Sequence, residues 1–234
     1  MTAWAIIVAG GTGTRMGAEV PKQLLKLKGR TILDRTLDPF RACPDIAGVI
    51  IAAAPSVLEH VESAILPAEC GETSIMAIPG GEERQDSVRN ALSEVPSDTD
   101  VIVVHDAVRP FIRSELINEC VAAARRRGAV SVMLPVTETI KVVTSGRVFN
   151  TPDRATLWIT QTPQAFQASI LRAAHEAARH DGIPATDDCM LAERLGHPVY
   201  VVEGSDENIK ITTPTDLAVA AALLDIFEHG GKNA

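Results

Sequence analysis

The chain has 234 residues and a formal net charge of -8 at pH 7, with 46% hydrophobic residues but only 3% aromatic ones. Its core must be built mainly from Val, Ile, Leu and Ala, which suits a parallel sheet buried on both faces. The acidic balance without a basic run argues against general affinity for nucleic acid, and the longest apolar runs are too short to span a membrane.

Short apolar runs bounded by turn residues predict a series of buried strands, with helical patterns between them. Apolar side chains recur at helical spacing in Thr31–Ala42 and Ser114–Arg127, and Thr213-Pro214 has the signature of a helix start. Strands that alternate with helices favour an α/β fold with a doubly wound, mostly parallel sheet. The expected strands are Ala3–Ala9, Val49–Ala54, Ile75–Ile78, Val101–His105, Ala129–Val136 and Val199–Val202.

One stretch departs from this alternation. Thr139–Val143 and Arg147–Asn150 are β-prone, and Ser145-Gly146 lies between them as a turn, which predicts a polar hairpin. Such a hairpin has no obvious way to bury both faces within its own domain, so we expect it to pack on another subunit. Residues 1–234 are therefore predicted to form a single domain with a dimerisation arm at about 137–156.

Cysteine and histidine spacing indicates neither a disulfide framework nor a zinc site. The histidines show no HExxH pattern, and His175 and His180 fall in a helical pattern where we expect them at the surface. No basic start or cleavage site precedes the first strand, so the predicted location is the cytoplasm. The cysteines have no CxxC pair and are typical of reduced, half-buried thiols; they are Cys43, Cys70, Cys120 and Cys189.

A glycine-rich loop, Gly10–Gly17, follows the first strand directly. Backbone N–H groups of such a loop can close around phosphate oxygens. A dinucleotide fingerprint starting at Gly11 needs glycine where the chain has Met16, and the Gly-Lys-Ser/Thr of a Walker A loop is missing. A phosphate loop with two adjacent cations, Arg15 and Lys22, remains. The alternative is an ordinary glycine turn with two solvated charges.

Asp106 immediately follows the apolar strand Val101–His105. Ligands of such sheets gather at the carboxyl ends of the strands, and a carboxylate there can hold Mg²⁺ against a triphosphate. The alternative is a carboxylate that caps the following helix or loop. A second glycine turn, Gly80–Ser87, opens a helix after the strand Ile75–Ile78, and Glu207–Thr212 carries one lysine ahead of the last helix.

Taken together, these segments resemble the 2-C-methyl-D-erythritol 4-phosphate cytidylyltransferase family through nearly the whole chain. The first loop alone is shared with many sugar-nucleotide pyrophosphorylases. The resemblance to this one family is specific because all the motifs occur together and in the same order along the chain. The matching segments are Gly10–Gly17 with Pro21-Lys22-Gln23, Gly80–Ser87, His105–Pro110, Thr139-Ile140-Lys141, Asp153-Arg154 with Leu157-Trp158, Thr162-Pro163-Gln164 and Asn208-Ile209-Lys210.

The resemblance implies a Rossmann-like homodimer whose arms reach across to shared active sites. It implies transfer of CMP from CTP to 2-C-methyl-D-erythritol 4-phosphate, with release of pyrophosphate, in non-mevalonate isoprenoid biosynthesis. The implied catalytic cations around the triphosphate are Arg15, Lys22 and Lys210. The implied CTP-binding residues are Gly10, Gly11, Gly13, Thr14, Gly80, Gly81, Glu82, Ser87 and Ala107. The implied acceptor-binding residues are Asp106, Arg109, Thr139, Arg154 and Thr162, and Asp106 would also lie next to Mg²⁺ or another divalent cation.

Two positions depart from the family pattern: Gly10, where some members have a second alanine, and Val108, where a second alanine is frequent. Ribitol-5-phosphate cytidylyltransferases share most of the motifs, so ribitol 5-phosphate is the alternative acceptor. Asp153-Arg154 followed by Leu157-Trp158 resembles the methylerythritol enzymes more. A non-catalytic nucleotide-binding module is the alternative of another class, but it would need no residues for a second substrate.

Overall fold

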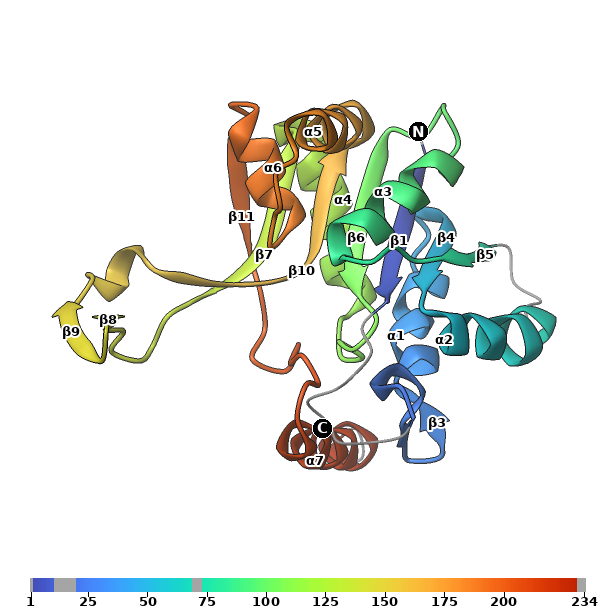
Figure 1. Cartoon of the computed structure of the whole chain (residues 1–234). Coiled ribbons are helices and arrows are strands. Elements are labelled where there is room, and N and C mark those ends of the chain that lie inside the picture. The colour runs from blue at the N-terminus through green and yellow to red at the C-terminus, as the bar shows by residue number, and fades with distance from the viewer. Residues whose placement is uncertain (1, 11–19, 69–72, 231–234) are drawn as a thin grey trace.

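The structure is a computed structural model that describes residues 2–10, 20–68 and 73–230 (Figure 1). Within these residues a 7-stranded sheet has the order β11-β7-β10-β6-β1-β4-β5. Every neighbouring pair is parallel except the two pairs that β10 makes with β6 and β7. This confirms the prediction of a mostly parallel α/β sheet. The strands are β1 (Ala3–Ala9), β4 (Ile46–Ala53), β5 (Ser74–Pro79), β6 (Val101–Asp106), β7 (Ala129–Pro135), β10 (Trp158–Gln167) and β11 (Val199–Glu203).

Helices cover both faces of this sheet, as a doubly wound fold requires. Successive side chains of a strand point to opposite faces: Ile7 of β1 packs in the cluster with α1, α2 and α4, whereas Ile6 packs in the cluster with α3, α5 and α6. The first layer contains α1 (Ile32–Arg41), α2 (Pro55–His60) and α4 (Ser114–Arg127), and the second contains α3 (Arg84–Glu94), α5 (Ala168–Asp181) and α6 (Asp188–Arg194).

The last helix, α7 (Pro214–Gly230), lies beyond the carboxyl ends of the central strands (Figure 1). It begins as predicted, with the Thr213 hydroxyl accepting a hydrogen bond from the backbone N–H of Asp216 (3.2 Å). Its buried residues share a small cluster with Ile32 and Val108. The described residues also form a short strand pair, β2 (Lys26–Leu27) and β3 (Arg30–Thr31), and four short helical turns: Lys22–Leu24, Val61–Ile65, Leu66–Ala68 and Arg154–Thr156.

Within the 7-stranded sheet, β10 is the strand that the sequence pattern did not predict. It inserts between β6 and β7, but half of its residues are Thr or Gln and it contains Pro163, which is unusual in a central strand. The structure accommodates the proline at an irregularity of the β7 ladder between Thr160 and Gln164, where the Thr162–Pro163 peptide bond is cis. The irregular part of the strand passes the carboxyl end of β6, where the Thr162 hydroxyl contacts Asp106.

The predicted hairpin is present as β8 (Val142–Thr144) and β9 (Arg147–Asn150), and it projects from the body of the molecule (Figure 1). Ser145 and Gly146 both have positive φ angles, 52° and 75°, as a tight two-residue hairpin turn requires. All residues of the two strands are exposed, and the side chains include Phe149, 77% exposed.

The expected surface position of His175 is wrong. His175 is 2% exposed, because α6 packs against its side of α5 and Asp188 accepts a hydrogen bond from its Nε2 (2.9 Å). His180 is exposed, as expected. Three cysteines, Cys43, Cys120 and Cys189, are free and fully buried, more so than expected, and Cys70 lies outside the described residues. In the part of the chain that the structure describes, no helix combines the length and the apolar character needed to cross a membrane.

Candidate active site

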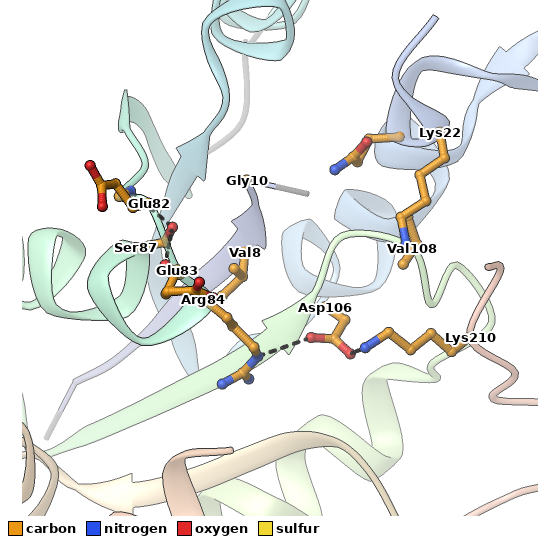
Figure 2. Close-up of a pocket in the computed structure, with 12 residues that line it drawn as sticks. Val8, Gly10, Lys22, Glu82, Glu83, Arg84, Ser87, Asp106, Val108 and Lys210 are labelled. Carbon is orange, nitrogen blue, oxygen red and sulfur yellow. Dashed lines mark hydrogen bonds and ion pairs between the residues drawn. The ribbon is translucent and has the colours of Figure 1, made fainter. Parts of the chain in front are cut away.

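A pocket of about 350 Å³ opens at the carboxyl ends of β1 and β6 and beside the loop that joins β5 to α3 (Figure 2). Side chains of Lys22 and Lys210 lie on one side of it, and Glu82 and Ser87 lie on the other (Figure 2). Pockets at this edge are expected, because loops that leave the carboxyl ends of parallel strands converge there. The sequence motifs therefore meet in one place although they are far apart along the chain.

The loop after β1 is described only in part. Gly10, Lys22 and Gln23 line the pocket, whereas Gly11, Gly13, Thr14 and Arg15 lie outside the described residues. Gln23 is buried and donates from Nε2 to the carbonyl oxygen of Ala9 (3.0 Å), so the Pro21-Lys22-Gln23 segment is fixed to the end of β1. This contact places Lys22 at the pocket.

The loop between β5 and α3 presents backbone groups to the opposite side of the pocket. The Ser87 hydroxyl accepts from the N–H of Gly81 (3.0 Å) and donates to the carbonyl oxygen of Glu83 (3.2 Å). Glu83 and Asp86 close the first turn of α3 as a capping box. The helix N-terminus, with its positive dipole end, therefore borders the pocket.

Asp106 lies at the end of β6 and is held by three cations. Lys210 Nζ lies 2.8 Å from Oδ2, Arg84 Nε 3.4 Å from Oδ1, and Arg109 Nε 3.6 Å from Oδ2. Burial alone would raise the pKa of Asp106, but the charges of Lys210, Arg84 and Arg109 outweigh it and lower the pKa. The carboxylate is therefore ionised. It accepts no hydrogen bond from a backbone N–H of the described chain, which excludes the capping alternative there.

Thr162 connects Asp106 to a buried histidine. Its hydroxyl accepts from the N–H of Asp106 (3.1 Å) and lies 3.1 Å from Nδ1 of His105. Nε2 of His105 lies 3.1 Å from the carbonyl oxygen of Arg109. Because a carbonyl only accepts, Nε2 carries the proton, and Thr162 donates to Nδ1. Burial lowers the pKa of His105 to about 4, so the ring is neutral near pH 7. The sequence did not predict this internal role of Thr162.

Lys210 is placed by the residues that precede it. Asn208 is buried, donates from Nδ2 to the carbonyl oxygen of Thr162 (2.8 Å), and accepts at its own carbonyl from Nη1 of Arg109 (2.8 Å). The N–H of Ile211 donates to the carbonyl oxygen of Val108 (2.9 Å). These bonds fix the segment on both sides of Lys210, so its ammonium group reaches Asp106.

Most of the described site residues that the sequence predicted come together here. Gly80, Ala107, Arg109 and Thr162 do not line the pocket, but each contacts a residue that does. Thr139 and Arg154 belong to the arm and do not line the pocket. The predicted residues that line the pocket are Gly10, Lys22, Gly81, Glu82, Ser87, Asp106 and Lys210.

Arg84 is the functional candidate that sequence reasoning missed. It lines the pocket between Ser87 and Asp106 and pairs with both Asp106 and Asp188 (Figure 2). The available signal was its place in the Gly80–Ser87 segment, one helical turn before Ser87. A cation in the first turn of a helix that opens at a strand end is well placed to face a bound anion.

Comparison with known proteins shows the family of the chain. The sequence model of the family described as IspD, 2-C-methyl-D-erythritol 4-phosphate cytidylyltransferase, matches residues 3–226. The chain belongs to this family. The 2-C-methyl-D-erythritol 4-phosphate cytidylyltransferase of Desulforamulus reducens is 44% identical over 221 residues, which cover 94% of each chain. That of Geobacter metallireducens is 40% identical over 227 residues, covering 96% of this chain and 98% of the relative.

Solved structures of the same family share the fold. The 4-diphosphocytidyl-2C-methyl-D-erythritol synthase of Anaerococcus prevotii superposes with a TM-score of 0.84 at 30% identity, covering 96% of this chain and 98% of that one. The 2-C-methyl-D-erythritol 4-phosphate cytidylyltransferase of Thermus thermophilus has a TM-score of 0.77 at 35% identity, covering 95% and 98%. The likeness therefore extends over the sheet, its helices and the arm together.

Two glycines of the pocket are expected to respond differently to alanine. A Cβ on Gly81 would overlap Cβ and the carbonyl carbon of Asp86, so the loop that presents its N–H to Ser87 must move. A Cβ on Gly10 would lie 3.1 Å from the Ser87 hydroxyl, which can shift slightly. We expect Gly81→Ala to raise the KM for CTP about tenfold or more and Gly10→Ala to change it less than about threefold.

Steady-state kinetics of both variants, with circular dichroism to verify folding, measures this difference. Equal KM values for the two variants would show that the β5–α3 loop does not form the nucleotide side of the pocket.

Proposed function

We propose that the chain transfers CMP from CTP to 2-C-methyl-D-erythritol 4-phosphate, giving 4-diphosphocytidyl-2-C-methyl-D-erythritol and pyrophosphate for non-mevalonate isoprenoid synthesis. The observation that supports it most is that the two sides of the pocket carry different groups. Cationic side chains gather near Asp106 on one side, and the backbone amides of the Gly81 loop lie on the other (Figure 2). A triphosphate fits the first side and a nucleoside fits the second.

The reaction needs little from the protein beyond position and charge. The acceptor is a phosphate monoester, already an anionic nucleophile, so no general base is required. Its oxygen attacks the α-phosphorus of CTP in line, and the bond from that phosphorus to the pyrophosphate oxygen breaks. Two anions must meet and negative charge moves onto the leaving group, so Lys22 and Lys210, with Arg15, stabilise the transition state electrostatically.

Asp106 is proposed to hold Mg²⁺ or another divalent cation together with the triphosphate. Among the described residues, no three His, Cys, Asp or Glu side chains lie close enough together to bind a metal alone. One carboxylate placed like that of Asp106 fits Mg²⁺, which takes one or two protein carboxylates and completes its shell with phosphate oxygens and water. When bound, the metal would neutralise phosphate charge. The protein holds the carboxylate in place through Lys210 and Arg84.

The acceptor site is proposed to be completed by a second copy of the chain. Arg154 and Thr139 lie on the exposed arm, where Arg154 Nη1 donates to the carbonyl oxygen of Thr137 (2.8 Å). The arm also exposes apolar side chains that a monomer leaves in water, including Val143 (56%), Val148 (60%) and Phe149 (77%). A homodimer in which each arm covers its partner would bury these side chains and deliver Arg154 to the partner's pocket.

The cytoplasm is the proposed location. The described cysteines, Cys43, Cys120 and Cys189, are free thiols, which suits a reducing compartment. The binding-module alternative is disfavoured by the family to which the chain belongs. Ribitol 5-phosphate remains the acceptor to be tested against methylerythritol phosphate.

A matrix of two nucleotides and two acceptors tests the proposal. We expect pyrophosphate release from CTP only when 2-C-methyl-D-erythritol 4-phosphate is present, and little with ribitol 5-phosphate. With UTP the rate at low concentration should fall by several powers of ten, because backbone carbonyls near Gly80–Ser87 would face a carbonyl instead of the cytosine amino group. Comparable turnover with ribitol 5-phosphate, or with UTP, would contradict the corresponding assignment.

A further inference from the structure

A series of ionisable side chains, each in contact with the next, extends from the pocket into the protein interior. Lys210 contacts Oδ2 of Asp106, and Arg84 Nε contacts Oδ1 (Figure 2). Arg84 continues the series, because its Nη1 lies 2.6 Å from Oδ2 of Asp188. His175 ends it, with Nε2 2.9 Å from Oδ1 of Asp188. Each carboxylate is thus held at both oxygens by different partners.

Asp188 stands outside the pocket. It is 1% exposed at the start of α6, and its backbone N–H donates to Oε1 of Gln164 on β10 (3.1 Å). Burial alone would raise its pKa, but the charge of Arg84 and the hydrogen bond from His175 outweigh it and lower the pKa. Asp188 is therefore an ionised carboxylate, fixed by α5 and β10, that cannot touch a substrate.

Stability alone does not account for such a group. Taking a carboxylate out of water is costly, and well-packed apolar residues often stabilise a fold as well as a buried ion pair does. A carboxylate can also fix the orientation of its partner, because Asp188 accepts a hydrogen bond from one particular nitrogen of Arg84, Nη1. With Nη1 held at Asp188, the guanidinium plane is fixed and Nε is aimed at Asp106.

We propose that Asp188, supported by His175, is a positioning residue of the active site: it orients Arg84, and Arg84 orients the carboxylate of Asp106. The orientation of Asp106 decides which oxygen faces Lys210 and the phosphates. A small rotation of this carboxylate displaces the charges that the transition state requires. The kinetic part of this inference rests on the proposed function.

Replacing Asp188 with Asn tests the proposal with little change of shape. We expect kcat to fall about 10- to 100-fold in a folded protein, since misplacement by about 1 Å has effects of this size, and the KM for CTP to change much less. The matched control is Asp100→Asn. It breaks another ion pair, to Arg125 Nε (2.9 Å), at the opposite end of the sheet, and should leave kcat unchanged.

A double-mutant cycle with Arg84→Met separates positioning from a merely structural role. If Asp188 acts through Arg84, adding Asp188→Asn to Arg84→Met should lower kcat no further. It should also raise the melting temperature of that variant, because it removes the charge of a buried carboxylate that has lost Arg84 and keeps only its contact with His175. If the kcat effects multiply, or if Asp188→Asn alone keeps kcat within about twofold, the proposal is wrong.

A readout without turnover keeps the inference separate from the proposed function. The Nε–H signal of Arg84 in an NMR spectrum can be assigned by its loss in Arg84→Met. We expect Asp188→Asn, and not Asp100→Asn, to shift this signal and speed its exchange with water. An unchanged signal would overturn the positioning role even in an active enzyme. Inactivity of the wild-type protein with both acceptors would instead refute the proposed function and leave this measurement valid.

Discussion

Replacing Lys210 with Ala is expected to lower kcat/KM by about 10²–10³-fold, the usual effect of removing one preorganised group that stabilises transition-state charge. The fold should survive, because Lys210 is exposed and Asp106 keeps its contacts with Arg84 and Arg109. Lys22→Ala should act in the same way, since Lys22 lines the same side of the pocket. Pyrophosphate release at saturating acceptor measures both variants.

Two further variants make this result specific. Lys210→Arg keeps the charge but not the compact ammonium group, so activity should recover only in part. Lys26→Ala removes an exposed lysine of β2 that does not line the pocket, and its activity should match that of the wild type. If Lys22→Ala or Lys210→Ala kept near-normal activity, the assignment of these residues to the triphosphate would be wrong.

The site was predictable wherever a motif follows directly on a strand. An apolar run identifies the strand, the carboxyl ends of parallel strands share one edge, and polar residues just beyond them must meet there. Gly10, Gly81 and Asp106 were placed by this argument, and all three line the pocket. Lys210 follows no predicted strand directly. Only its family motif indicated it, and Asn208 supplies the physical reason for its position.

What could not be predicted depends on contacts between distant segments. Arg84 and Asp188 are 104 positions apart, and neither the pattern of α3 nor that of α6 indicates that they pair. His175 was misplaced for the same reason, because a polar residue in a helix is buried only when another element brings it a partner. Strand β10 was missed because its polar residues and Pro163 hide the strand pattern. It is held as a strand by its backbone pairing with β6 and β7, which cannot be seen in its own sequence.

The arm makes a prediction about the assembly. If each arm crosses a two-fold axis, Arg154 of one subunit serves the pocket that contains Lys210 of the other. Arg154→Ala and Lys210→Ala homodimers should then each be nearly inactive. Unfolding and refolding them together should produce mixed dimers in which one site carries both defects and the other carries neither.

Random pairing makes half of the dimers mixed, and each of these has one intact site of two, so about a quarter of normal activity should return. Mixing Arg154→Ala with Thr139→Ala is the matched control: both changes lie on the arm, every site keeps one defect, and no activity should return. If Arg154 serves its own subunit instead, the first mixture also stays inactive. Each chain of that mixture carries one of the two changes, so a site built within a single chain always has a defect. With dimer exchange verified by mass, an inactive first mixture would therefore exclude shared sites.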